Sequence, residues 1–163
     1  MMAPMKRITH QLTYPGATVE QVTGMLMTPA FREAVCEAQK DVQKSEVTID
    51  GTTVTIDQTQ GADRIPGFAK KFVGDEIRIL QEERWTSPTH GDVTVTIPGK
   101  PGQIAGSVDV VAAGDGVTET VDLEITVSIP FVGGKIESLI GDKLKNSLKT
   151  ENRVGRTWLE GQA

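Results

Sequence analysis

The residues that could carry acid–base chemistry lie on one predicted strand, 75–86. Gln81, Glu83 and Trp85 share a face with Ile79, because successive side chains of a strand point to opposite faces. A carboxylate inside an apolar space would have a raised pKa and could act as a general acid or base. The alternative, which we favour, is that Glu83 lies near the strand end and reaches water, since charged residues are almost never buried unpaired.

A second polar group lies on the C-terminal segment, which is predicted to be helical. Lys143, Ser147 and Glu151 project into the same arc as the apolar residues Ile136 and Ile140. One interpretation is that they contact the polar head group of a ligand. The other, which we favour, is that the helix leaves the sheet here and its long side chains extend to solvent.

Other catalytic or metal-binding patterns are missing from the sequence. His10 and His90 are far apart, and no His or Cys pair has the spacing of zinc ligands. Neither a GxSxG motif nor a P-loop is present. The loop Gly99-Lys100-Pro101-Gly102 suits a hairpin and precedes no helix that could hold phosphate. We therefore predict neither a metal nor a cofactor.

The elements that must position these residues begin with a strand over 6–14, which alternates apolar and polar residues. Two short helices should follow. Thr18 and Gln21 have the spacing of a capping box at the start of the first. Thr28-Pro29 predicts the start of the second, with threonine as the cap and proline at the first helical position.

Residues 45–129 are rich in valine, isoleucine and threonine, which favour strands. The dipeptide Asp50-Gly51 is a strong hairpin signal. With the first strand, the segment predicts seven strands in an antiparallel meander. The six strands after the first are expected at 45–50, 52–60, 75–86, 92–97, 103–113 and 118–129.

A short helix is expected over 66–73, with Phe68 and Phe72 on one side of it. It could be a lid that closes a pocket mouth, with glycines at 61, 67 and 74 as hinges. The alternatives are that both phenylalanines pack into the core, or that the helix contacts a membrane. Two lysines and two phenylalanines are too few to favour membrane contact.

The long amphipathic helix expected over 134–159 is the element large enough to cover the apolar face of the sheet. It contains Gly141, although glycine inside a helix costs roughly 1 kcal/mol against alanine. This glycine could allow close approach to the sheet or leave volume for a ligand.

Composition limits the classes of function. The 163 residues fit a single domain, and the net charge of -5 argues against nucleic acid as a partner. No apolar run is long enough to span a bilayer, and the N-terminal segment lacks the apolar core of a signal peptide. The lone Cys36 cannot form an internal disulfide, so a reducing, cytoplasmic setting is expected.

The order of strand, two short helices, six strands and long helix resembles the START or birch-pollen-allergen superfamily, also called the SRPBCC or helix-grip fold. Within it, IPGFAKKFVGDEIRILQEERW (65–85) and IPFVGGKIESLIGDKL (129–144) resemble a bacterial branch catalogued as a domain of unknown function. The resemblance implies an α+β fold in which a curved sheet grips the C-terminal helix. It also implies binding of lipids, sterols or polyketides between sheet and helix, or aromatase/cyclase activity.

We therefore predict one helix-grip domain over 1–163 that binds a small apolar or amphipathic molecule. The alternatives are a cyclase-type enzyme that uses Glu83 or His90, and an interaction module without a ligand. Since aromatic residues are few, we expect a cavity of roughly 300–1,000 Å³. Neither the ligand's identity nor the oligomeric state follows from the sequence. The residues predicted to contact the ligand are Phe68, Phe72, Ile79, Gln81, Trp85, Val95, Val108, Val110, Leu123, Ile136 and Ile140.

Overall fold

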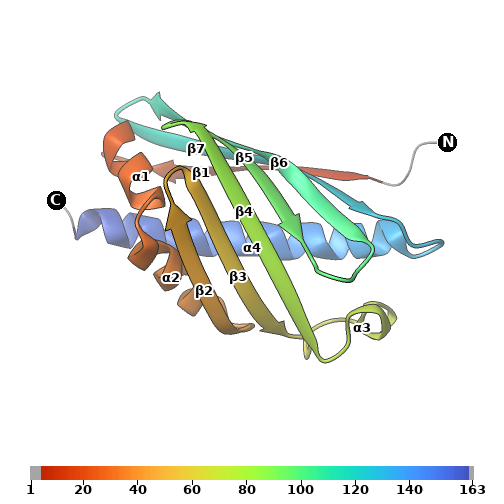
Figure 1. Ribbon diagram of the computed structural model, residues 1–163. Coiled ribbons are helices and arrows are strands. Elements are labelled where there is room, and N and C mark those ends of the chain that lie inside the picture. Colours follow the sequence, from red (N-terminus) through yellow and green to blue (C-terminus); the bar gives the residue numbers. More distant parts are fainter. Residues whose placement is uncertain (1–4, 162–163) are drawn as a thin grey trace.

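A computed structural model describes residues 5–161. They form seven strands and four helices (Figure 1). The strands are β1 (Lys6–Tyr14), β2 (Val42–Asp50), β3 (Thr53–Gly61), β4 (Glu76–Ser87), β5 (His90–Thr96), β6 (Gly102–Ala113) and β7 (Gly116–Val127). The helices are α1 (Val19–Leu26), α2 (Pro29–Ala38), α3 (Gly67–Val73) and α4 (Gly133–Glu160).

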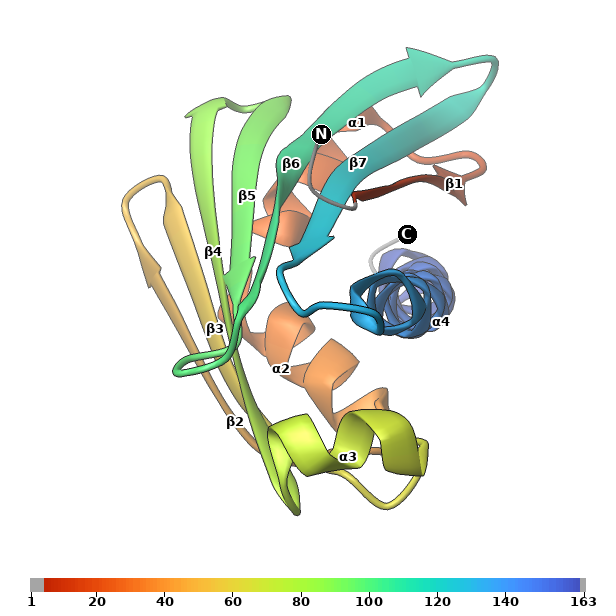
Figure 2. The same ribbon diagram turned by 90° about the vertical axis from the view of Figure 1, so that its right-hand side faces the viewer.

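All seven strands pair antiparallel in one sheet with the order β1-β7-β6-β5-β4-β3-β2. Each strand from β2 to β6 pairs with the next along the chain, and β1 pairs with the other edge of β7. The sheet curves around α4, which Figure 2 shows nearly end-on within the concave face. The predicted α+β fold, with a seven-stranded antiparallel sheet and a long C-terminal helix, is confirmed.

Local sequence signals set most of the element boundaries. Asp50 and Gly51 turn the chain between β2 and β3, and Gly51 has a φ of 59° that favours glycine. The capping box at Thr18 is confirmed, because Gln21 N–H donates to the Thr18 hydroxyl at 3.2 Å and Thr18 N–H donates to the Gln21 side chain at 2.9 Å. Thr28 does not cap α2 with its side chain, because its hydroxyl instead donates to the Gly24 carbonyl at 2.8 Å.

Gly106 in β6 lies against the backbone of β7. A Cβ at this position would lie 1.8 Å from the Asp122 carbonyl oxygen of β7. No side chain could occupy that space, so glycine allows the two strands to approach each other here.

The most deeply buried aromatic side chains lie at the end of the molecule where α1 and α2 lie. Tyr14 and Phe31 are fully buried there, and the rings of Phe31 and Trp158 meet edge to face with centroids 5.7 Å apart. At the other end, near α3, the space between sheet and helix is lined mainly by isoleucine, leucine and valine. Side chains therefore pack densely between the sheet and one end of α4, and they leave space unfilled at the other end.

Two glycines allow α4 to approach the sheet. A Cβ at Gly141 would lie 3.4 Å from Ile8 Cγ2 and 3.6 Å from Ile125 Cδ1. At Gly155 it would lie 2.8 Å from Tyr14 Cε1, which is closer than a carbon contact permits. Gly141 faces β1 and β7 and lines no cavity, so close approach, rather than ligand volume, explains this glycine.

Candidate functional site

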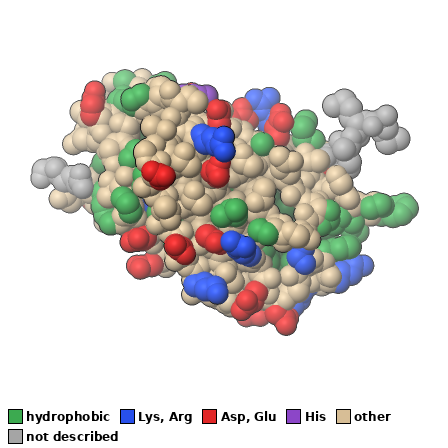
Figure 3. Space-filling model, in the orientation of Figure 1, with side chains coloured by type: hydrophobic (Ala, Val, Ile, Leu, Met, Phe, Trp, Pro, Cys, Tyr) green, Lys and Arg blue, Asp and Glu red, His purple; other side chains and the backbone are tan. Residues whose placement is uncertain are grey.

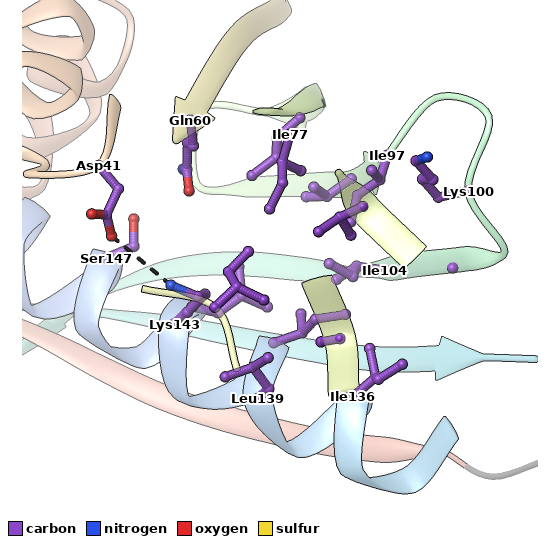
Figure 4. A pocket seen from close by; sticks show the side chains of 18 of the residues that line it. Asp41, Gln60, Ile77, Ile97, Lys100, Ile104, Ile136, Leu139, Lys143 and Ser147 are labelled. Carbon is purple, nitrogen blue, oxygen red and sulfur yellow. Dashed lines mark ion pairs between the residues drawn. The ribbon is translucent and has the colours of Figure 1, made fainter. Parts of the chain in front are cut away.

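A cavity of about 230 Å³ lies between the concave face of the sheet, α3 and the first half of α4 (Figure 4). Strand residues enter it by the two-residue alternation that places Ile77, Ile79 and Gln81 of β4 on the concave face. Its apolar lining comprises Ile56, Ile65, Ala69, Phe72, Val73, Ile77, Ile79, Val95, Ile97, Ile104, Val127, Ile129, Ile136, Leu139, Ile140 and Leu144.

This cavity has the predicted position but lies below the predicted size of roughly 300–1,000 Å³. Ile65, Ala69 and Phe72, from α3 and the residues before it, form part of its wall and take up space at one end. The remaining volume still exceeds that of one or two waters, since a water occupies about 30 Å³ in the liquid.

Charged and polar side chains lie on one side of this cavity. Asp41, which precedes β2, and Lys143 of α4 form an ion pair with a 3.9 Å separation of Nζ and Oδ2 (Figure 4). Gln60 and Ser147 are nearby, and Lys100 lies at the opposite wall, on the β5–β6 loop. A ligand here would therefore meet an apolar surface with a polar margin.

A second cavity of about 80 Å³, which we call the inner cavity, lies deeper between sheet and helices. Seven residues line both cavities, which places the two side by side. They are Gln39, Ile56, Gln58, Gln81, Val95, Leu144 and Ser147. Unlike the larger cavity, the inner cavity is bordered by Arg32, Glu83, Glu119 and Glu151.

Glu83 is buried in this cavity wall, with 3% of its surface exposed. Both of its oxygens accept from the Arg32 guanidinium, at 2.7 and 2.9 Å, and they also accept from Gln81 Nε2 at 2.6 Å and Trp85 Nε1 at 3.0 Å. The prediction that Glu83 reaches water is therefore wrong. Strand β4 extends beyond it to Ser87, and a buried arginine that the sequence analysis did not foresee supplies the counter-charge.

Glu119 of β7 is also buried, with 2% of its surface exposed. Its Oε1 has no hydrogen-bond partner among residues 5–161. Burial raises its pKa well above the ordinary value, and the neighbouring charge of Glu151 raises it further, because both disfavour the ionised form. This carboxyl group therefore holds its proton more tightly than an exposed glutamic acid does.

Glu151 of α4 lies 3.8 Å from Arg32, measured between Oε1 and Nη1. Burial raises its pKa to about 7, and the negative charge of Glu83 contributes in the same direction while Arg32 opposes it. Glu151 therefore changes its charge within the physiological pH range. The prediction that Lys143, Ser147 and Glu151 extend to solvent is wrong for the last two, because Ser147 and Glu151 line the inner cavity.

The structure brings most of the predicted contact residues to the two cavities. Val110 and Phe68 line neither: Val110 is core, and Phe68 is 38% exposed, with Lys135 Nζ 6.0 Å from its ring centre. The predicted residues that line the larger cavity are Phe72, Ile79, Gln81, Val95, Ile136 and Ile140. Those that line the inner cavity are Gln81, Trp85, Val95, Val108 and Leu123.

His90, which the enzyme alternative assigned to catalysis, lines neither cavity. Its Nδ1 lies 2.6 Å from Asp109 and its Nε2 lies 3.3 Å from Asp92, all at the exposed surface. The hydrogen bond with Asp109 raises its pKa. The hypothesis that His90 acts inside the cavity is therefore wrong.

Sequence reasoning missed Arg32 and Glu119. Glu119 was open to detection, because it alternates with Val121, Leu123 and Ile125 on the buried face of β7. Arg32 gave no such signal, since an arginine on a short amphipathic helix is typically exposed.

Metal binding and membrane crossing find no support in residues 5–161. No group of three His, Cys, Asp or Glu side chains there is arranged to hold a metal ion. In the same part of the chain, every helix is too short or too polar to cross a membrane.

Exposed hydrophobic side chains gather at the end of the molecule where α4 begins (Figure 3). Phe131, just before α4, is fully exposed and has a φ of 70°, which is rare for a residue other than glycine. Together with Phe68 it places two aromatic rings outside the larger cavity rather than within it.

Comparison with known proteins identifies a family and several relatives. The model of a family described as "Protein of unknown function (DUF2505)" matches residues 9–159. An uncharacterized protein of Mycobacterium tuberculosis (strain H37Rv) is 29% identical over 118 residues, which cover 68% of this chain and 67% of that protein.

Among solved structures, norcoclaurine synthase from Thalictrum flavum superposes with a TM-score of 0.67 at 17% identity, covering 96% of this chain and 88% of that one. The Zhui aromatase/cyclase from Streptomyces sp. R1128 gives a TM-score of 0.66 at 9% identity, covering 96% and 94%. At these identities the likeness shows the fold alone, a curved antiparallel sheet that grips a long C-terminal helix.

Proposed function

The chain belongs to the family described as "Protein of unknown function (DUF2505)", and we propose that it binds a small apolar or amphipathic molecule between its sheet and α4. The observation that carries this proposal is the cavity of about 230 Å³, whose walls are mainly aliphatic side chains. Ligand sites in proteins are typically concave, mostly apolar and equipped with a few polar groups.

Binding would proceed by removal of apolar ligand surface from water, which contributes about 25 cal/mol for each Å² buried. The aliphatic walls from β3 to β6 and from α4 supply that surface. The polar margin formed by Gln60, Lys143 and Ser147 would orient the ligand. The fold is shared with Ara h 8.0201, with an aromatase/cyclase and with a norcoclaurine synthase solved in complex with dopamine and hydroxybenzaldehyde, which supports a small-molecule role without naming the molecule.

Lipids, sterols and polyketides are the ligand classes that the superfamily resemblance implies. The cavity volume of about 230 Å³ favours a molecule smaller than a full sterol or diacyl lipid, such as one with a single medium-length alkyl chain. Cys36 is a buried free cysteine, which fits a function in the reducing environment of the cytoplasm.

Calorimetric titration of the purified protein with 1-octanol tests the proposal directly. We expect saturable binding at one site. The variant Ile79→Phe, which fills the larger cavity, should weaken that binding about tenfold or more, since a displaced ligand loses most of its buried surface. Leu80→Phe is the matched control, because the neighbouring residue points to the other face of β4.

Two results would contradict the proposal: no saturable binding of octanol by the wild-type protein, or equal loss of binding in the two variants. Native mass spectrometry of the protein purified from its own host gives an independent measurement. A co-purified small molecule that disappears in Ile79→Phe and persists in Leu80→Phe would identify the natural ligand class.

A further inference from the structure

The inner cavity has more negative than positive groups. Its ionisable lining contains one guanidinium, Arg32, and three carboxyl groups, Glu83, Glu119 and Glu151. Arg32 directs its terminal nitrogens to Glu83 and donates through Nε to the Leu26 carbonyl at 2.8 Å. Since Glu83 accepts four hydrogen bonds, this pair is internally satisfied and leaves two carboxyl groups in excess.

Within the described residues, the hydrogen bonding of the two carboxyl groups in excess is incomplete. Glu119 Oε1 has no partner within residues 5–161 although the residue is only 2% exposed. Glu151 has Arg32 at 3.8 Å, beyond hydrogen-bond distance. A buried acceptor left without a donor destabilises the folded protein. Such a site is best completed by a group that donates several hydrogen bonds and carries positive charge.

The nature of that group follows from the surroundings. The carboxyl groups are not arranged to hold a metal ion, as judged over the described residues. The inner cavity, at about 80 Å³, is large enough for a small polar head group, and it shares a wall with the apolar cavity of about 230 Å³. These features fit an organic cation with an apolar part.

We propose that the inner cavity binds the protonated amino group of an amphipathic primary amine, whose apolar part occupies the larger cavity. The inference rests on the proposed function and specifies the chemistry of its ligand. An ammonium group supplies three N–H donors, which can reach Glu119, Glu151 and the Ser147 hydroxyl. Arg32 remains paired with Glu83 and is not displaced.

Amine binding should be coupled to release of protons. Without a ligand, burial raises the pKa values of Glu119 and Glu151, so protons occupy these sites in part. The ionisable groups that face Glu119 and Glu151 are Tyr14 from β1, Arg32 and Cys36 from α2, and Glu83 from β4. A cation favours the ionised carboxylates, and amine affinity should therefore rise with pH.

The test compares two probes of equal chain length, octylamine and 1-octanol, by calorimetric titration at pH 6 and pH 8. A primary amine has a pKa near 10.4 and stays protonated at both pH values. We expect octylamine to bind about tenfold or more tighter than octanol at pH 8, because hydrogen bonds between charged groups are stronger than those between neutral groups. The ratio should shrink at pH 6.

Variants assign the effect to the inner cavity. Glu119→Gln, which keeps the side-chain shape, should remove most of the preference for octylamine and leave octanol affinity nearly unchanged. Glu137→Gln is the matched control, since Glu137 is a buried carboxylate of α4 that lines neither cavity and accepts from Val127 N–H. It should preserve the preference.

Octanol binding with equal or weaker octylamine binding by the wild-type protein would overturn the amine assignment and leave the proposed function intact. A preference that is the same at pH 6 and pH 8, or that survives in Glu119→Gln, would also overturn it. Failure of both probes to bind would overturn the proposed function itself. The wild-type comparison at two pH values is decisive even if Glu119→Gln does not fold.

Discussion

At the scale of single residues, the inner cavity is organised by the pair of Arg32 and Glu83. The guanidinium and the carboxylate meet through two hydrogen bonds at 2.7 and 2.9 Å, and Gln81 and Trp85 hold the carboxylate from the side. Two further carboxyl groups surround the same cation. Loss of the Arg32 cation should therefore lower the unfolding free energy more than loss of one carboxylate does.

Replacing Arg32 by Met should cost about 3–5 kcal/mol of unfolding free energy, because it leaves Glu83 charged and buried without a partner. Glu83→Gln should lower the unfolding free energy less, because Glu151 and Glu119 remain beside Arg32 and can balance its positive charge. Urea denaturation of both variants at pH 7 measures the difference. A larger loss in Glu83→Gln than in Arg32→Met would contradict this account.

Glu119 and Glu151 should make stability depend on pH. A carboxyl group with a raised pKa holds its proton more tightly in the folded than in the unfolded chain. Its contribution therefore declines as pH rises from the unfolded value near 4.5 through the folded value, which is about 7 for Glu151. Glu119→Gln should flatten this decline between pH 5 and pH 8, and it should raise the unfolding free energy at pH 8 by about 1–2 kcal/mol.

Urea midpoints for the wild-type protein and Glu119→Gln at pH 5, 6.5 and 8 measure this effect. Glu137→Gln again serves as the control with a buried carboxylate outside the cavities. The same pH slope in wild type and Glu119→Gln would show that Glu119 does not hold a proton in the folded state.

At the scale of elements, α4 offers a matched pair of glycines. Alanine at Gly141 meets ordinary contacts, the nearest at 3.4 Å, and should stabilise the protein by about 1 kcal/mol through helix propensity. At Gly155, an alanine Cβ would lie 2.8 Å from the Tyr14 ring. This collision should destabilise the protein by about 1–3 kcal/mol. Thermal unfolding of the two variants gives the signs, and a stabilised Gly155→Ala would contradict the packing described.

Helix α3 offers a second matched pair, Phe68 and Phe72. Phe72 lines the larger cavity whereas Phe68 points away from it and is partly exposed. If α3 gates the cavity, Phe72→Ala should speed release of octanol about tenfold with less than about 1 kcal/mol lost, while Phe68→Ala leaves the rate unchanged. Stopped-flow release and urea midpoints test this. A large fall in midpoint with an unchanged rate for Phe72→Ala would assign Phe72 to the core instead.

At the scale of the whole molecule, the uneven distribution of aromatic side chains divides the interior. The α1 and α2 end contains the buried or partly buried aromatic residues Tyr14, Phe31, Trp85 and Trp158. The α3 end contains the larger cavity. Regions with few buried contacts open more readily than the core. The division thus places the proposed binding site in the part of the fold that can open at the lowest free-energy cost.

Hydrogen exchange should reveal this division. We expect amides of β1, β7 and the second half of α4 to exchange slowly, and those of α3 and the first turns of α4 to exchange faster. Saturating octanol should slow exchange chiefly in the second group, because a ligand stabilises the state that binds it. Exchange in α3 as slow as in β7 without ligand would contradict the prediction.

Local patterns in the sequence were sufficient to predict the order of the elements. Alternation with period two marked the strands, Asp50-Gly51 marked a hairpin, and Thr18 with Gln21 marked the start of α1. These signals act between residues close in the chain, which is why they can be recognised without a structure. The same patterns assigned most of the cavity-facing residues to one face of the sheet.

The tertiary structure alone decided the polar site and the size of the cavity. Arg32 and Glu83 are separated by 51 residues, and nothing local to either indicates the other. Whether a carboxyl group such as Glu119 is paired depends on which side chains the fold brings beside it. A cavity volume, in turn, is the small difference between the space that sheet and helix enclose and the side chains that fill it. The low content of aromatic residues predicted that some space would remain unfilled. Only the packed structure gives the volume of that space.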